Sequence, residues 1–350
     1  MSDVSTGPVQ NPRATLRSLL GGHYQFQFLS TGLQLGLFRL LHREPGLSRA
    51  EIGSRVGLEE LPARVLLLGC VAIGLLRKDG DRYFTTPMSE PLAGELEDVP
   101  AAFGPWRHYR PMAWFAESLK ENTNIGLQRE VPGDSPDLYG RLAGNPELEQ
   151  AFQKLMGAAS REVAAELVQK VDLSGYSHIL DIGGGTATNA AAIANQWPEL
   201  RITILDLPTV VAKANARIAE LGLADRVQAV GLDAFNDELP TDADCVFFGH
   251  FLEIWSVEKI KALLAKAARA VGPGGGLVVV APTQHDDETG PPIAAALSAY
   301  FHAVASGEGM TYTCAEYEKW FTEAGFRPTG RIYVGSLNEA VISGVRIAAV

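Results

Sequence analysis

The sequence predicts an α/β fold preceded by a mainly helical region. From residue 176 onward, short apolar segments alternate with segments of helical composition, which is typical of a parallel sheet covered on both faces. Two extended segments near the end of the chain, joined by a short link, predict an antiparallel hairpin at the sheet edge. Before residue 105, leucine-rich helical patterns lead to a hairpin signal. A length of 350 residues suits two such domains.

The amino-terminal part is predicted to be a winged helix. Apolar residues recur at helical spacing from Arg13 to Leu41, around much of the circumference, as in a helix packed against other helices or a second subunit. Ser48 and Glu51 form a capping-box pattern, and a helical run follows from Leu61 to Leu76. Asp79-Gly80 between short extended segments then predicts a hairpin. For this region we expect a role in dimerisation and in covering the substrate.

The predicted organisation has four parts, with boundaries set by these changes of pattern. They are a flexible tail over 1–12, a helical and winged-helix dimerisation domain over 13–105, linking helices that cover the active site over 106–172, and a ligand-binding α/β domain over 173–350.

Charge and composition exclude several classes of function. Lys plus Arg is 30 and Asp plus Glu is 41, so the net charge is −11 and general attraction to nucleic acid is absent. A winged-helix regulator that binds DNA is therefore disfavoured. The cysteines at 70, 245 and 314 form no close pair that would indicate a disulfide framework or a zinc site. No signal peptide is recognisable, and the longest apolar run, Val65–Leu76, is too short to span a membrane, so a cytoplasmic protein is predicted.

The α/β part resolves into elements in a regular order. The predicted helices cover 188–196, 209–222, 257–271 and 314–324. The predicted strands are His178–Asp181, Arg201–Asp206, Val227–Gly231, Cys245–Phe248 and Leu277–Ala281, followed by the hairpin segments Arg331–Val334 and Ala340–Ala349.

A glycine-rich turn follows the first of these strands. Gly183, Gly184 and Gly185 let the backbone turn sharply and approach a ligand before a helix begins. Asp206 ends the next strand, 21 residues after Gly185, where an acid can accept hydrogen bonds from both ribose hydroxyls. Asp233 ends the third strand, and such an acid with an apolar ring nearby can hold an adenine. Helix capping alone is the simpler explanation of one such acid, but it fits three acids in series poorly.

Two alternative functions also involve this turn. A nicotinamide dinucleotide requires a third glycine at the position of Thr188, and the carboxy-terminal hairpin also argues against an oxidoreductase of that kind. A cofactor binder without catalytic activity is the other alternative.

The motifs together resemble those of a known family. Leu180–Gly185 (LDIGGG), Leu205–Pro208 (LDLP) and Gly272–Gly275 (GPGG) are similar to the motifs of S-adenosylmethionine-dependent small-molecule methyltransferases of the plant-type O-methyltransferase family. The resemblance covers most of the chain. It implies a class I methyltransferase domain with a Rossmann-like sheet, an amino-terminal winged-helix dimerisation domain and a homodimer with intertwined helices.

The resemblance also assigns cofactor contacts. The three glycines are expected to line the methionine part of S-adenosylmethionine, Asp206 to hold the ribose, and Asp233 with Phe235 to bracket the adenine. The complete expected set is Asp181, Gly183, Gly184, Gly185, Asp206, Leu207, Asp233, Ala234, Phe235 and Gly249.

The chain departs from the family at the catalytic position. The family places a His base in a segment that resembles Leu-His-Asp-Trp, and the matching stretch here has Glu253 and Ile254 in place of His and Asp. Glu253, with His250 alongside, is one candidate for the base or for orienting the substrate. A second interpretation is an acceptor that needs little base, such as an enol, an aromatic carbon or a sulfur. A third is a metal held by His250, Glu253 and His302.

The acceptor pocket is predicted from the position of segments in the family. The residues expected to contact the substrate are His23, Trp106, Tyr109, His302, Met310 and Tyr312. The resulting prediction is a cytoplasmic, homodimeric methyltransferase of secondary metabolism acting on a small molecule, with O-methylation favoured and C- or S-methylation as alternatives. No metal, nucleic acid or membrane partner is part of this prediction.

Overall fold

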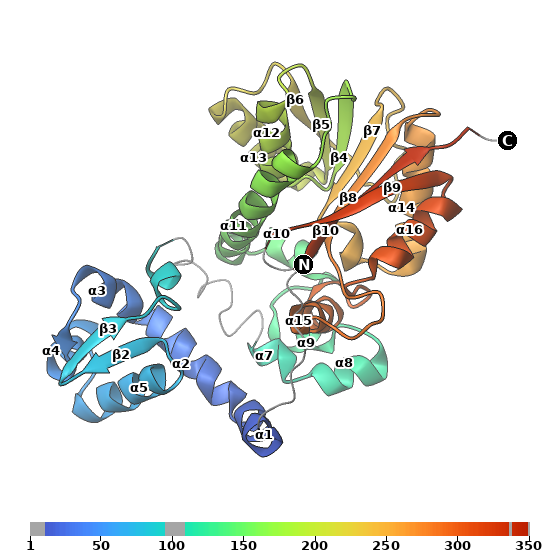
Figure 1. The fold of residues 1–350 in the computed structure, drawn as a ribbon. Helices are drawn as coiled ribbons and strands as arrows, with labels where there is room; N and C mark the ends of the chain where they lie inside the picture. The colour runs from blue at the N-terminus through green and yellow to red at the C-terminus, as the bar shows by residue number, and fades with distance from the viewer. Residues whose placement is uncertain (1–10, 95–108, 336–337, 349–350) are drawn as a thin grey trace. The chain divides into compact units, whose positions relative to one another are not determined.

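The computed structural model describes residues 11–94, 109–335 and 338–348 (Figure 1). The chain divides into two compact units, Met1–Gly104 and Pro105–Val350. Within the described residues, no helix combines the length and the apolar character needed to cross a membrane. The predicted cytoplasmic location remains a prediction.

The amino-terminal unit combines short helices with a three-stranded sheet in the order β1-β3-β2. Its elements are α1 (Pro12–Leu20), α2 (Gly22–Gln34), α3 (Leu37–Arg43), β1 (Leu47–Ser48), α4 (Arg49–Val56), α5 (Glu60–Ala72), β2 (Leu76–Asp79), β3 (Arg82–Thr85) and the 3₁₀ turn η1 (Glu90–Ala93).

Local sequence signals explain most of these boundaries. The hairpin at Asp79-Gly80 is confirmed, because Asp79 of β2 pairs with Arg82 of β3. The capping box is also confirmed: Ser48 Oγ accepts from the Glu51 amide at 3.3 Å, and the Ser48 amide donates to Glu51 Oε2 at 2.7 Å. The apolar stretch from Arg13 forms three helices rather than one, because the chain turns at Gly21 and again at Gly36, whose φ is +66°.

Several large apolar side chains of this unit are exposed. They lie on helices α1, α2 and α5 and are Leu16, Leu19, Leu20, Tyr24, Leu61, Val65 and Leu68. A separate set, which includes Leu37, Phe38 and Leu67, is buried and forms the core of the unit. The unit therefore has both a packed interior and apolar side chains that the unit itself leaves uncovered.

The carboxy-terminal unit begins with helices and continues as an α/β domain. Its helices are α7 (Arg110–Met112), α8 (Phe115–Glu121), α9 (Ile125–Glu130), α10 (Leu138–Ala143), α11 (Pro146–Lys170), α12 (Thr188–Gln196), α13 (Pro208–Glu220), α14 (Val257–Ala270), α15 (Pro292–Tyr300) and α16 (Cys314–Glu323), with the 3₁₀ turn η3 (Leu252–Ile254) and the π-helical turn η4 (Phe301–Ala305). Its strands are β4 (His178–Ile182), β5 (Arg201–Asp206), β6 (Val227–Gly231), β7 (Cys245–Gly249), β8 (Gly276–Pro282), β9 (Phe326–Val334) and β10 (Glu339–Arg346).

The seven strands form one sheet in the order β6-β5-β4-β7-β8-β10-β9. Strands β4 to β8 pair in parallel, and β10 joins antiparallel to both β8 and β9. The predicted parallel sheet and terminal hairpin are thereby confirmed. The chain runs outward from β4 to β6 and then resumes at β7 on the other side of β4. Ligands of open α/β sheets bind beyond the carboxyl ends of the strands at such a reversal.

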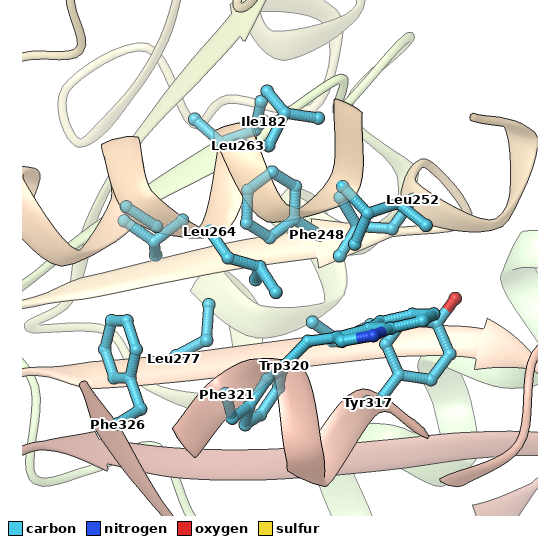
Figure 2. Close-up of a cluster of buried hydrophobic side chains, with 14 of the residues drawn as sticks. Ile182, Phe248, Leu252, Leu263, Leu264, Leu277, Tyr317, Trp320, Phe321 and Phe326 are labelled. Carbon is cyan, nitrogen blue, oxygen red and sulfur yellow. The ribbon is translucent and has the colours of Figure 1, made fainter. Parts of the chain in front are cut away.

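Helices cover both faces of this sheet, with α11, α12 and α13 on one side and α14 and α16 on the other (Figure 1). On the α14–α16 side, Phe248 and Leu252 pack with Leu263 of α14 and with Tyr317 and Trp320 of α16 (Figure 2). Burying such side chains contributes about 1.5–3 kcal/mol each. The packing fixes the end of β7 and the η3 turn, which carry the candidate base.

Candidate active site

The turn after β4 is built from glycine. Gly183 and Gly185 adopt φ values of +72° and +55°, which favour glycine, and the Gly183 amide donates to the Leu205 carbonyl at 2.8 Å. A Cβ on Gly184 would lie 2.5 Å from Asp181 Oδ2, so a side chain there would displace the carboxylate. A Cβ on Gly185 would meet no atom within 4 Å. The turn therefore lies against Asp181 on one side and leaves open space on the other.

Asp181 is the inner acid of this site. It is 1% exposed, and within the described structure neither of its carboxylate oxygens has a hydrogen-bond partner. Burial, and then the nearby charge of Asp206, raise the pKa of Asp181 to about 7. A buried carboxylate without partners is costly, and a cationic or hydrogen-donating ligand would relieve that cost.

Asp206 ends β5 and has partners on both oxygens. Its Oδ2 accepts from the Gly185 amide at 2.9 Å, and its Oδ1 accepts from the Leu207 amide at 2.7 Å. Burial raises the pKa of Asp206, and these two hydrogen bonds counteract part of that rise. Each oxygen retains a further lone pair for a ligand hydroxyl. Leu207 is 47% exposed, which leaves an apolar side chain beside these oxygens.

The loop after β6 carries the third acid. Asp233 Oδ1 accepts from the Phe235 amide at 2.9 Å, and Oδ2 accepts from Asn236 Nδ2 at 2.7 Å. Burial acts to raise the pKa of Asp233, but these hydrogen bonds outweigh it and lower the pKa overall. The Asp233 carboxylate thus shapes its own loop. Lys266 Nζ donates to the carbonyls of Ala234 and Phe235 at 2.9 and 2.7 Å and holds the same loop from α14.

Aromatic rings lie beside this loop. Phe235 stacks with Phe251 at a centroid distance of 6.3 Å and meets Trp255 edge-on at 4.9 Å. Lys259 Nζ lies 4.9 Å from the Trp255 ring centroid and pairs with Glu308 at 2.9 Å. Gly249, another predicted contact, packs against Asn189 of α12. The apolar ring that the sequence predicted at Phe235 is therefore part of a larger aromatic group.

His250 and Glu253 come together just beyond β7. His250 has φ of +54°, and its amide donates to the Val280 carbonyl at 2.8 Å, which fixes its direction at the strand end. Glu253 is 2% exposed, and burial raises its pKa to about 7 although the charge of His250 acts to lower it. Within the described structure, Glu253 Oε2 and His250 Nδ1 are buried without hydrogen-bond partners. Two proton-accepting atoms are therefore available at one place.

The segment 306–312 holds the turn that carries Glu253. Ser306 Oγ donates to the Ile254 carbonyl, and Tyr312 Oη donates to the Trp255 carbonyl at 2.8 Å. Gly309 packs directly against the backbone of Glu253 and Ile254, where a Cβ would collide with main-chain atoms. The position of Glu253 is thus constrained by contacts to the main chain of residues 253–255.

The predicted substrate residues are dispersed. His302 Nε2 lies 3.2 Å from the Ser118 carbonyl, and the Tyr312 hydroxyl is used by Trp255. Met310 and Tyr109 are each 38% exposed. His23 is an exposed residue of α2 in the amino-terminal unit and stacks near Tyr24, at 3.9 Å between ring centroids. Trp106 lies outside the described residues.

The structure does not group the three residues of the metal alternative, His250, Glu253 and His302. His302 belongs to η4 and faces the Ser118 carbonyl of α8 instead of the other two residues. Among the residues that the structure describes, no three His, Cys, Asp or Glu side chains are grouped so that they could hold a metal ion.

Comparison with known proteins places the chain in a family. Residues 113–327 match the O-methyltransferase domain, and residues 18–94 match the O-methyltransferase dimerisation domain. The chain belongs to the O-methyltransferase family. It is an S-adenosylmethionine-dependent methyltransferase of small molecules, as its sequence motifs predicted.

Individual relatives cover nearly the whole methyltransferase. L-tyrosine C(3)-methyltransferase of Streptomyces lavendulae is 39% identical over 328 residues, 92% of this chain and 89% of that protein. The 3-hydroxy-5-methyl-1-naphthoate 3-O-methyltransferase of Streptomyces sahachiroi is 30% identical over 99% of both chains. The crystal structure of the S-adenosylmethionine-dependent methyltransferase SibL in its apo form is 38% identical, with a TM-score of 0.82 over 95% of this chain and 99% of that one.

Two residues of the site were missed by the sequence prediction. Glu339, 2% exposed at the start of β10, has its Oε1 3.9 Å from His250 Nε2. Tyr317 of α16 is fully buried, its hydroxyl has no partner within the described structure, and burial followed by the charge of Glu253 raises its pKa. Neither residue belongs to a motif. The only sequence signal for Glu339 is its position directly before a predicted strand.

Proposed function

We propose that this enzyme methylates a ring carbon ortho to the hydroxyl of a phenolic small molecule, such as an aromatic amino acid. The observation that carries this proposal is a pair of buried atoms, Glu253 Oε2 and His250 Nδ1, that have no hydrogen-bond partner among the described residues. Methylation of carbon requires a group that takes the hydroxyl proton and a group that takes the ring proton. The 39% identity to an L-tyrosine C(3)-methyltransferase supports the same choice.

Glu253 and His250 each accept one proton in the proposed reaction. Glu253 accepts the phenol proton, and the resulting negative oxygen makes the ortho carbon nucleophilic. S-adenosylmethionine supplies an electrophilic methyl group, whose bond to sulfur breaks as the new carbon–carbon bond forms. His250 Nδ1 then accepts the ring proton, and Glu253 returns its proton to the oxygen. The balance is one methyl group gained and one proton released. The contacts of residues 306–312 with the Glu253 turn limit its movement, and such positioning accounts for much of enzymatic rate enhancement.

The residues around the glycine turn fit the cofactor. Gly185 borders open space, and Asp206 has further lone pairs for a ligand. The buried Asp181 oxygens have no partner in the part of the chain that the structure describes. We assign the methionine part to the glycine turn and Asp181, and the ribose to Asp206. The adenine is assigned to Phe235, with Asp233 supporting the loop that carries it.

A second candidate is O-methylation of the hydroxyl itself. The naphthoate 3-O-methyltransferase relative, which is 30% identical over the full length, favours it. This reaction needs only the first proton transfer, to Glu253, so His250 Nδ1 would have no role.

Isotope labelling distinguishes the two reactions. The purified enzyme is incubated with ¹³C-methyl S-adenosylmethionine and either L-tyrosine or a hydroxynaphthoate, each carrying deuterium ortho to the hydroxyl. Carbon methylation removes one deuterium and gives a ¹³C NMR signal of an aryl methyl group. Retention of all deuterium, with the signal of a methoxy group, overturns carbon methylation and establishes the second candidate.

The enzyme is further proposed to act as a homodimer. The exposed apolar side chains of α1, α2 and α5 and the match to a dimerisation domain support this. Light scattering after size exclusion is expected to give twice the chain mass of 37.6 kDa. The double variant Leu19→Glu/Leu68→Glu is expected to shift that mass toward the monomer, and an unchanged mass would exclude these residues from the interface.

A further inference from the structure

Glu339 and His250 meet across an intervening strand. His250 follows β7, Glu339 opens β10, and β8 lies between these two strands. The His250 amide donates to Val280 of β8, and Glu339 pairs with Pro282 of the same strand. Neighbouring strands are about 4.8 Å apart, so the two backbones are separated by roughly twice that distance. Only their side chains can meet, over the end of β8.

The Glu339 side chain is directed toward the imidazole by its surroundings. Its Oε1 is 3.9 Å from His250 Nε2, a distance within the range of an ion pair. Its Oε2 lies on the side of Gly335, where a Cβ would come within 2.6 Å of that oxygen. The Glu339 side chain is 3% exposed and the His250 side chain 25% exposed, so water screens the pair little.

We propose that Glu339 is a positioning residue: it binds His250 through Nε2–H and so presents Nδ1 to the substrate as the proton acceptor. The proposal rests on the proposed function, in which His250 takes the ring proton. A carboxylate in this place fixes the tautomer of the ring and stabilises the imidazolium that forms. Nε2 faces a carboxylate and Nδ1 has no partner within the described structure, which is the arrangement such a tautomer requires.

Charges on the neighbouring elements act in the same direction. Burial lowers the pKa of His250, but Glu339 of β10 and Glu253 of η3 outweigh burial and raise it. Tyr317 of α16 is influenced by the Glu253 charge and stays neutral because its own pKa is raised. The Glu339 charge also contributes to the raised pKa of Glu253. Removing the Glu339 charge should therefore lower the pKa values of both His250 and Glu253.

NMR titration of ¹³C-labelled histidine tests the link directly. The protein has 7 histidines, and a His250→Asn variant identifies the signal of His250. In Glu339→Gln the pKa of His250 is expected to fall by about one unit or more. Glu339→Asp keeps the charge and is expected to retain most of the original value. Glu220→Gln removes an exposed carboxylate on α13 and should leave the signal unchanged. An unchanged His250 pKa in folded Glu339→Gln would overturn the proposal.

The pH profile of kcat extends the test to catalysis. Glu339→Gln is expected to lower the plateau of kcat about tenfold or more, with little change in KM, and to move the acidic limb to lower pH. A lowered His250 pKa with an unchanged plateau would leave the Glu339–His250 contact standing but overturn the positioning role of Glu339. An unchanged plateau in His250→Asn would overturn the role of His250 in the proposed function. The two ideas can thus fail separately.

Discussion

The acids at the outer strands of the sheet differ from those at its centre in what they bind. Asp206, at the end of β5, accepts from the Gly185 amide of the turn after β4 and from the Leu207 amide of its own loop. Asp233, after β6, accepts from the Phe235 amide of its own loop. Asp181 at the end of β4 and Glu253 after β7 are buried with unpartnered oxygens within the described structure. These last two flank the point where the strand order reverses. Main-chain amides therefore hold the outer acids in place, and Asp206 meets a ligand only with its remaining lone pairs, whereas whole oxygens of the central acids are left for a ligand.

The free-energy cost of ionisation differs between the central acids and the outer acids. A buried acid that lacks partners resists ionisation, and burial raises the pKa of both Asp181 and Glu253 to about 7. Such residues reduce the stability of the empty protein, and strongly shifted groups in a cleft are common at functional sites. Replacing each acid by its amide tests whether this division holds.

The largest effect is expected for Glu253→Gln. The amide cannot accept the phenol proton, so kcat should fall by about 10²–10⁴ while cofactor affinity is retained. Calorimetric titration with S-adenosylhomocysteine measures the affinity, and steady-state kinetics measure kcat. Glu258→Gln, an exposed residue of α14, is the matched control. Full turnover by Glu253→Gln would remove this residue from the chemistry.

Asp181→Asn is expected to change the pH dependence of stability. The pKa of this acid rises from 3.8 in the unfolded chain to about 7 in the folded protein. The contribution of Asp181 to the free energy of unfolding is therefore fully present below pH 4 and is lost as the pH rises through 7. The amide removes that loss, which amounts to as much as about 4 kcal/mol for a fully buried group. Urea unfolding at pH 5 and pH 8 measures it. A variant no more stable than the native protein at pH 8 would contradict the account of Asp181.

Asp206→Asn should weaken cofactor binding while preserving the fold. The amide can still accept one of the two backbone hydrogen bonds, but it loses the charged acceptor for a ribose hydroxyl, which is worth about 1.5–3 kcal/mol. The dissociation constant of S-adenosylhomocysteine should rise about tenfold or more. If binding is unchanged, the ribose is held elsewhere.

The smallest effect is expected for Asp233→Asn. Asn can still cap the Phe235 amide, and the site is partly exposed, so the free energy of unfolding should fall by only about 1 kcal/mol. Thermal unfolding measures this change, and kcat should be close to native. A large loss of kcat would show that Asp233 acts on a ligand, as Asp181 and Glu253 are proposed to do, and would contradict the distinction between outer and central acids.

Sequence patterns locate the proposed cofactor residues more directly than the proposed acceptor residues. Gly183, Asp206 and Asp233 stand at strand ends, where local signals of turn and strand locate them. Glu339 could not be predicted in the same way, because its partner His250 is brought to it by pairing of β8 with both β7 and β10. The direction of His302 could not be predicted either, because it depends on the π-helical turn η4, for which periodicity gives no signal.

The position of β10 has a practical consequence for protein engineering. In the proposed mechanism this strand contributes Glu339, which positions His250, and it is separated from β4, β5 and β6 by β8 and β7. Mutant libraries limited to the first residues of β10 are therefore expected to vary the reactivity toward new acceptors. The affinity for the methyl donor is expected to stay unchanged in such libraries.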